Sequence, residues 1–119
     1  MSFENIIPPN QTTTDATPLT IAVRNISPGE SVRMVFTVNA KTAAGEVSTW
    51  KATRSVQRIG SAAPSVVGTA PALERENTVG AAAWVVAVGA SGNAVALTLT
   101  GAVATTIVWA IQVFAVVNP

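Results

Sequence analysis

Residues 105–117 read TTIVWAIQVFAVV, and this stretch decides the fold of the chain. β-Branched and other apolar residues dominate it, as they do in buried β-strands. Two shorter runs that alternate apolar positions, 83–88 and 94–100, precede it, and residues 77–119 contain no Asp, Glu, Lys or Arg. The three runs predict three consecutive strands at the centre of a β-sandwich, with the earlier part of the chain arranged to cover them.

The sequence before residue 77 predicts further strands at 19–26, 31–40, 47–59 and 65–70, followed by a polar loop at 71–80. The segment 31–40 alternates most clearly, whereas neither face of 47–59 is cleanly apolar, which favours a place near a sheet edge. In all we expect about seven to eight short strands with a turn roughly every ten residues, which is typical of an antiparallel sandwich or jelly roll. The predicted architecture is an extended N-terminal arm over 1–18 and one all-β sandwich domain over 19–119.

Composition excludes several classes of function. The chain has 119 residues, enough for one core, and 49% are hydrophobic while only 11% are charged. The absence of Cys and His rules out disulfides, thiolate chemistry and the usual zinc and copper ligand sets. A net charge of +1 gives no electrostatic reason to bind nucleic acid or an anionic membrane. We therefore expect no cofactor, no metal and no nucleic-acid partner.

The uncharged C-terminal half does not read as a membrane span. Gly, Ser, Asn and Thr interrupt it at short intervals, and its apolar period is two residues, whereas a spanning helix needs about 20 consecutive apolar residues. The N-terminal sequence MSFENIIPPNQ lacks the basic and apolar regions of a signal peptide. These features predict a soluble protein made in the cytoplasm.

No catalytic constellation stands out. Glu74 and Glu76 alternate onto one side and could form a carboxylate pair, but a solvated polar loop explains them equally well. Ser and Thr residues are plentiful but have no His to act as a base. The three Trp residues lie in predicted strands, where core or interface packing is a more usual role than sugar stacking. Three basic residues of 47–59, which favour protection of an edge over binding of phosphate or sugar, are Lys51, Arg54 and Arg58. We expect a protein without enzymatic activity.

The last predicted strand is apolar on both faces, which indicates assembly. A strand of an isolated two-layer sandwich should have one polar face, so we expect the second face to be covered by another copy of the chain. Coverage by a loop, or closure of one chain into a barrel, are the alternatives. The apolar residues of the arm either dock on a neighbouring subunit or belong to a disordered terminus. The predicted assembly interface consists of Phe3, Ile6, Ile7, Trp84, Val86, Trp109, Ile111 and Phe114.

Several short segments resemble a known group of proteins. They are WKA at 50–52 leading into SVQRIG at 55–60, VVGT at 66–69, AAAWVV at 81–86, GNAVALTLTG at 92–101 and TTIVW at 105–109. Together they are similar to the β-sandwich modules of tailed-bacteriophage virion proteins, found in fibre and spike subunits and in small accessory proteins. The resemblance covers about residues 19–117. It implies a structural subunit of the virion, often trimeric, and it supplies no catalytic residues.

Three hypotheses follow from the resemblance and the composition. The first is a homo-oligomeric, trimeric decoration or cement protein of the capsid, whose arm reaches the major capsid protein or another virion protein. The alternative is a tail-fibre or receptor-binding module that contacts host-surface glycans. The third is a free carbohydrate-binding domain, which would be monomeric. In the first two cases the protein is made in the host cytoplasm and resides in the virion.

Overall fold

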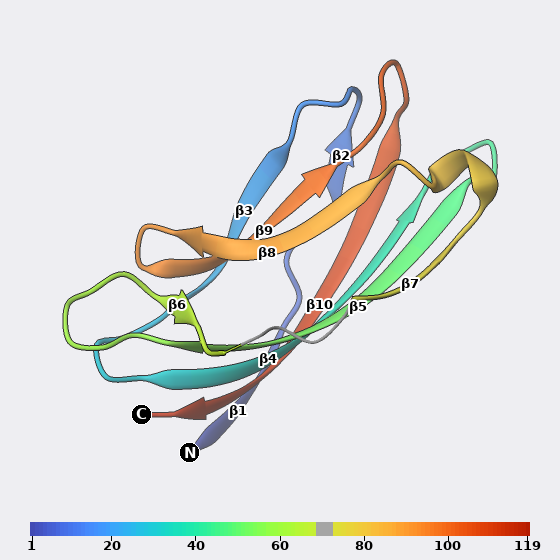
Figure 1. Cartoon of the computed structure of the whole chain (residues 1–119). Coiled ribbons are helices and arrows are strands. Elements are labelled where there is room, and N and C mark those ends of the chain that lie inside the picture. The colour runs from blue at the N-terminus through green and yellow to red at the C-terminus, as the bar shows by residue number, and fades with distance from the viewer. Residues whose placement is uncertain (69–72) are drawn as a thin grey trace.

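The computed structural model describes residues 1–68 and 73–119, and it is an antiparallel sandwich of two sheets (Figure 1). The large sheet has the order β1-β10-β4-β5-β6, with β2 also paired to β10 and β7 to β5. The small sheet has the order β3-β9-β8 and lies across the large one. The predicted all-β antiparallel sandwich is confirmed.

The bounds of the elements are as follows. They are β1 (Ser2–Ile6), β2 (Gln11–Thr13), β3 (Leu19–Asn25), β4 (Ser31–Lys41), β5 (Val47–Gln57), β6 (Ser65–Val66), β7 (Glu74–Asn77), the 3₁₀ turn η1 (Val79–Ala81), β8 (Val85–Ser91), β9 (Ala94–Thr100) and β10 (Ile107–Asn118).

Most predicted strands form where the alternation was strongest. β9 coincides with the predicted run 94–100, and β3, β4, β5 and β10 lie within two residues of their predicted ends. β8 begins two residues later than predicted, because η1 and a bond from the Trp84 amide to the Ala81 carbonyl occupy the preceding residues. Of the strand predicted at 65–70, β6 covers only the first two residues, and residues 69 and 70 of that prediction lie outside the described residues. The predicted polar loop contains β7 and η1.

The first 18 residues differ from the extended arm that the sequence predicts. β1 pairs with β10 from Ser2 opposite Val117 to Ile6 opposite Val113, and β2 pairs with it from Ile107 to Trp109. The two strands form one interrupted edge, because Pro8 and Pro9 have no amide to donate to the ladder. The arm is therefore part of the chain's own sheet.

The core lies between the two sheets and is centred on three tryptophans. The Trp109 ring stacks on Trp50 at a centroid distance of 5.6 Å and meets Trp84 at 6.2 Å. Trp109 is fully buried, and its indole Nε1 donates to the Thr13 hydroxyl at 2.9 Å. A Cβ at Gly101 would lie only 2.8 Å from that hydroxyl, so glycine leaves room for it. This contact fastens β2 to the centre of the core.

An ion-pair network fastens β1 at the other end of the same edge. The Arg24 guanidinium on β3 binds Glu4 on β1 through two hydrogen bonds of 2.8 Å, and it donates to Glu30 at 2.6 Å. These hydrogen bonds lower the pKa of Glu4 and of Glu30 below the ordinary value, against the opposing effect of burial. The network ties the small sheet to the outermost strand of the large one.

We predict that Thr13→Ala lowers the free energy of unfolding by about 1–3 kcal/mol, because it leaves the buried indole N–H without an acceptor. Urea unfolding followed by tryptophan fluorescence at a fixed protein concentration measures the change. Thr13→Ser keeps the hydroxyl and should lose less, and Thr12→Ala, at an exposed neighbour, should stay within about 0.5 kcal/mol of the wild type. An unchanged midpoint for Thr13→Ala would contradict the assigned bond.

The Arg24 network predicts a defined pH dependence. Because both carboxyl pKa values are lowered by folding, their contribution is complete well above pH 4.5 and is lost as the pH falls through the lowered values. Arg24→Gln should cost about 1–3 kcal/mol at pH 7, and the deficit should shrink below pH 4.5. Lys41→Gln, which removes one exposed positive charge, is the control and should show a deficit at neither pH. A deficit for Arg24→Gln that is constant between pH 7 and pH 3 would rule out this origin.

Candidate binding surface on the large sheet

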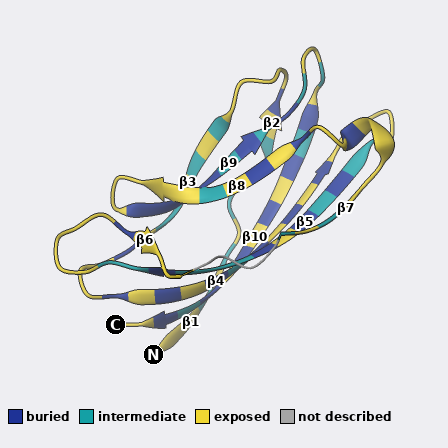
Figure 2. Cartoon of the chain, viewed as in Figure 1, coloured by how far each residue is buried: buried dark blue, intermediate teal, exposed yellow. Residues whose placement is uncertain are grey.

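The outer face of the large sheet is uncovered in the single chain. Figure 2 shows buried and exposed residues alternating along β10, because successive side chains point to opposite faces of a strand. The inner residues of β10 are Ile107, Trp109, Ile111, Val113, Ala115 and Val117, and all are buried. The outer residues are Val108, Ala110, Gln112, Phe114 and Val116, and all are exposed or half-buried.

An apolar cluster lies on this face where β1, β10 and β4 run side by side. The register places Phe3 opposite Val116, and Phe114 opposite Val35. The rings of Phe3 and Phe114 stack at a centroid distance of 6.2 Å and an interplanar angle of 21°. They are 64% and 46% exposed. We call these four residues, Phe3, Val35, Phe114 and Val116, the outer patch.

Polar residues border the outer patch. The amide of Gln112 donates to the Asn5 side-chain oxygen at 3.0 Å, along the side of the patch that faces the middle of β10. Arg33 is the residue opposite Val116 on β4, and it is exposed. An apolar centre with a polar border is the usual anatomy of a protein–protein interface.

The inner side of β1 explains how the outer patch is presented. Glu4 is held by Arg24, and Ile6 packs against the core from the half-buried end of the strand. With these two residues directed inward, Phe3 and Asn5 point outward. The ion pair therefore positions one of the two exposed aromatic rings.

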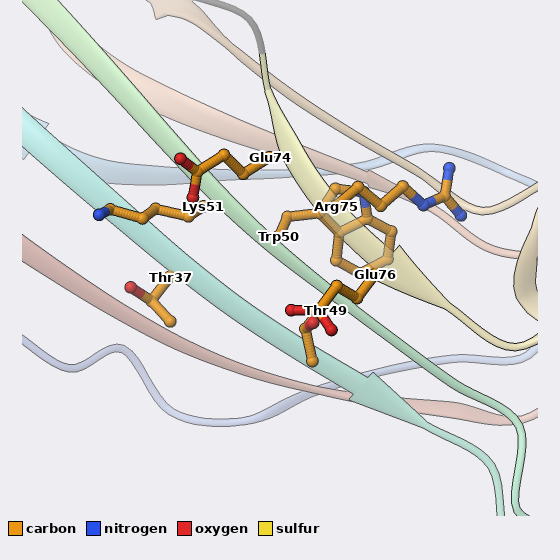
Figure 3. Close-up of a pocket in the computed structure, with 7 residues that line it drawn as sticks. All are labelled: Thr37, Thr49, Trp50, Lys51, Glu74, Arg75 and Glu76. Atoms are coloured by element: carbon orange, nitrogen blue, oxygen red, sulfur yellow. The ribbon is translucent and has the colours of Figure 1, made fainter.

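An open polar groove lies on the same face, toward β7. Figure 3 shows the residues that line it, with Lys51 and Thr49 on β5 and Glu74 and Glu76 on β7. Register places Glu74 opposite Lys51 and Glu76 opposite Thr49, so both carboxylates point to the outer side. Within residues 1–68 and 73–119, no three acidic side chains gather in a way that could hold a metal ion.

Trp50 borders this groove but offers no stacking platform. It is 3% exposed, and the Arg75 guanidinium covers its ring at 5.0 Å from the centroid. Arg75 is itself fixed by bonds to the Ser48 hydroxyl at 3.2 Å and to the Ala81 carbonyl at 2.6 Å. Because Trp84 and Trp109 are buried too, a sugar ring could not stack on any of the three tryptophans in this conformation.

The structure divides the predicted interface residues into two groups. Four of them, Trp84, Val86, Trp109 and Ile111, are at most 6% exposed and belong to the chain's own core. Phe3, Ile7 and Phe114 are exposed, and Ile6 is half-buried against the core. The register with β4 turns Trp109 and Ile111 inward, and Val86 and Trp84 are buried from the opposite side of the core, on β8 and just before it.

Two members of the outer patch were not among the predicted residues. Val35 stands among polar residues on the outer side of β4, and Val116 is on the outer side of β10. The alternation of each strand contained this signal. The alternation alone does not show the strand pairing that brings these two residues beside Phe3 and Phe114.

Of the predicted basic residues, Lys51 is exposed and lines the groove, whereas the others turn to the backbone. Arg58 donates to the carbonyls of Ala62 and Ile26 at 2.8 Å and 3.1 Å, and Arg54 donates to that of Thr53 at 2.8 Å. The three therefore do not form a single basic surface. No helix in the described part of the chain is long and apolar enough to cross a membrane.

Comparison with known proteins finds similarity at the level of solved structures, where two chains match. No family model matches the sequence, and no curated protein sequence matches it. A solved structure, that of the tailspike protein of Acinetobacter phage vB_ApiP_P1, aligns over 98% of this chain with 21% identity and a TM-score of 0.47. The chain spans 22% of the length of that protein.

Proposed function

We propose that the chain is a non-enzymatic structural module of a bacteriophage virion, which assembles with copies of itself through the outer patch. The observation that carries the proposal is the exposed, stacked pair of Phe3 and Phe114 on an otherwise well-packed sandwich. Large aromatic side chains are enriched at the centres of interfaces, where their burial contributes most of the binding free energy. The resemblance of the sequence segments to phage virion modules supports the role in the particle and favours three copies.

A second copy is the occupant that the outer face fits best. The face carries both signs of charge, with Arg33 beside the apolar end and Glu74 and Glu76 at the opposite side of the sheet. A ring of three copies requires a contact between two different surface regions. A heterologous contact in which Arg33 of one copy meets Glu74 or Glu76 of the next would pair opposite charges beside the outer patch.

The position of the arm favours a tail module over a capsid decoration protein. A decoration protein of the kind predicted would use a free arm to bury Phe3, Ile6 and Ile7 against another virion protein. In the structure β1 and β2 are bonded to β10 and anchored by Glu4 and Thr13. That anchoring favours the tail-fibre or receptor-binding alternative. Contact with a host-surface glycan would then use polar side chains outside the outer patch, because the proposed assembly buries Phe3 and Phe114 between copies.

Two features support the absence of catalysis in this proposal. The sequence has no His or Cys to serve as a base or nucleophile. The carboxylates of Glu74 and Glu76 face an open groove, in which water would compete with any ordered reaction.

The outer patch predicts how mass in solution responds to substitution. Light scattering should find the full chain as an oligomer, and Phe3→Ser combined with Phe114→Ser should lower the mass to half or less. The matched control is Val79→Ser combined with Val103→Ser, since these residues are 94% and 78% exposed outside the patch. A monomeric wild type, or a double phenylalanine variant that keeps its full mass and its circular dichroism, would overturn assembly through the patch.

Immunogold electron microscopy of phage particles that carry this chain tests its place in the virion. We expect label on the tail. Label confined to the head would favour the decoration role, and particles without label would overturn the virion role.

A further inference from the structure

The free edges of the two sheets differ in how they are protected against pairing with another chain. β1 and β7 carry charged residues, and β2 and β6 are at most three residues long. β3 has a bulge between Ala22 and Arg24, and Arg24 carries a charge. Charges, bulges and short length are the usual means by which an edge strand avoids pairing.

β8 has none of these protections. Its seven residues, VVAVGAS, contain no charge and no proline, and they pair in unbroken register with β9. Val85 is 49% exposed, and Ala87, Gly89, Ala90 and Ser91 are exposed as well. Such a strand has the features of a template for another strand.

The hairpin geometry identifies the backbone groups on the open edge. A two-residue loop, Gly92 and Asn93, joins β8 to β9, and Gly92 has a φ of 59°, as at the first position of a type II′ turn. Ser91 and Ala94 therefore form a hydrogen-bonded pair. Because such pairs alternate along an antiparallel ladder, Val85, Ala87 and Gly89 also direct their amides toward β9.

It follows that Val86, Val88 and Ala90 direct their amides and carbonyls away from β9. In the described part of the chain none of these groups has a hydrogen-bond partner. The Val88 side chain is only half-buried on the core side of this edge. A row of open backbone groups beside a half-covered valine is what an added strand would complete.

We propose that β8 pairs edge to edge with β8 of a second copy, joining two three-stranded sheets into one of six strands. A copy of β8 brings no charge against this uncharged edge and covers Val88 with an equivalent valine. The bulged and charged β3 closes the far edge, so pairing stops at two copies. This contact goes beyond the proposed function, because it involves no residue of the outer patch.

Hydrogen exchange on the full chain gives the sharpest test. At high protein concentration the amides of Val86, Val88 and Ala90 should become protected, and on dilution they should exchange at least tenfold faster. The amides of Val85, Ala87 and Gly89 should be protected at both concentrations, since they bond to β9. Rapid exchange of the first three amides at every concentration would overturn the proposal.

Ala90→Pro tests the same contact by substitution. Proline removes an outward amide and leaves the bonds to β9 in place, whereas Ala90→Ser keeps the amide and is the matched control. In the background of the double phenylalanine variant, the parent and Ala90→Ser should be dimers, and Ala90→Pro should have the 12.1-kDa mass of one chain. A monomeric parent in that background, or a dimer that survives Ala90→Pro, would overturn the proposal.

The proposed contact through the outer patch and the proposed pairing of β8 can be ruled out independently of each other. If outer-patch assembly is absent, the phenylalanine substitutions leave the mass unchanged while the alternating exchange pattern of β8 still appears. If β8 pairing is absent, the pattern is lost while the phenylalanine substitutions still lower the mass.

Discussion

The pairing of β10 on both of its edges is the constraint on which the rest of the structure depends. β4 bonds to one edge along 11 residue pairs, while β1 and β2 share the other. Because both edges of β10 are hydrogen-bonded, its other contacts are made by the side chains on its two faces. One face supplies Trp109 and its buried neighbours to the core. The small sheet then covers that face, and the opposite face is left to solvent. The outer patch is thus a direct consequence of where β10 lies.

The strands with a regular alternation could be predicted from the sequence, and the ones that tertiary pairing creates could not. β4 and β9 alternate or remain apolar throughout, so their period identifies them. β1 and β2 are short, polar and interrupted by Pro8 and Pro9, and they exist because β10 offers them an edge. β7 is a charged strand for the same reason, since β5 supplies its partner. The local sequence pattern does not show which distant strand has an open edge for pairing.

The candidate site shows the same division. The sequence indicates that β10 is apolar on both faces, and it selects Phe3 and Phe114, but it does not say which face is the core. That choice is made when Ile111 is aligned with Val38, and Val113 with Phe36, on the inner side of β4. The same alignment moves Trp109 inward and leaves Phe114 outside. Apolar character therefore identified the candidate residues, and the register of β10 with β4 determined which of them are buried in the core and which are exposed.

The closeness of the two chain ends has a mechanical consequence. Ser2 lies opposite Val117 on adjacent antiparallel strands, and Figure 1 shows both termini at the same end of the molecule. A force that pulls the termini apart would act on the five β1–β10 pairs one after another, starting with the pair nearest the ends. A force applied between Lys41 at the end of β4 and the C-terminus would instead load the β10–β4 ladder in shear, since these two points lie at opposite ends of the ladder and antiparallel hydrogen bonds are perpendicular to the strands. In the first direction the hydrogen-bonded pairs would break one at a time at low force, whereas in the second all pairs of the ladder would bear the load together and resist a higher force.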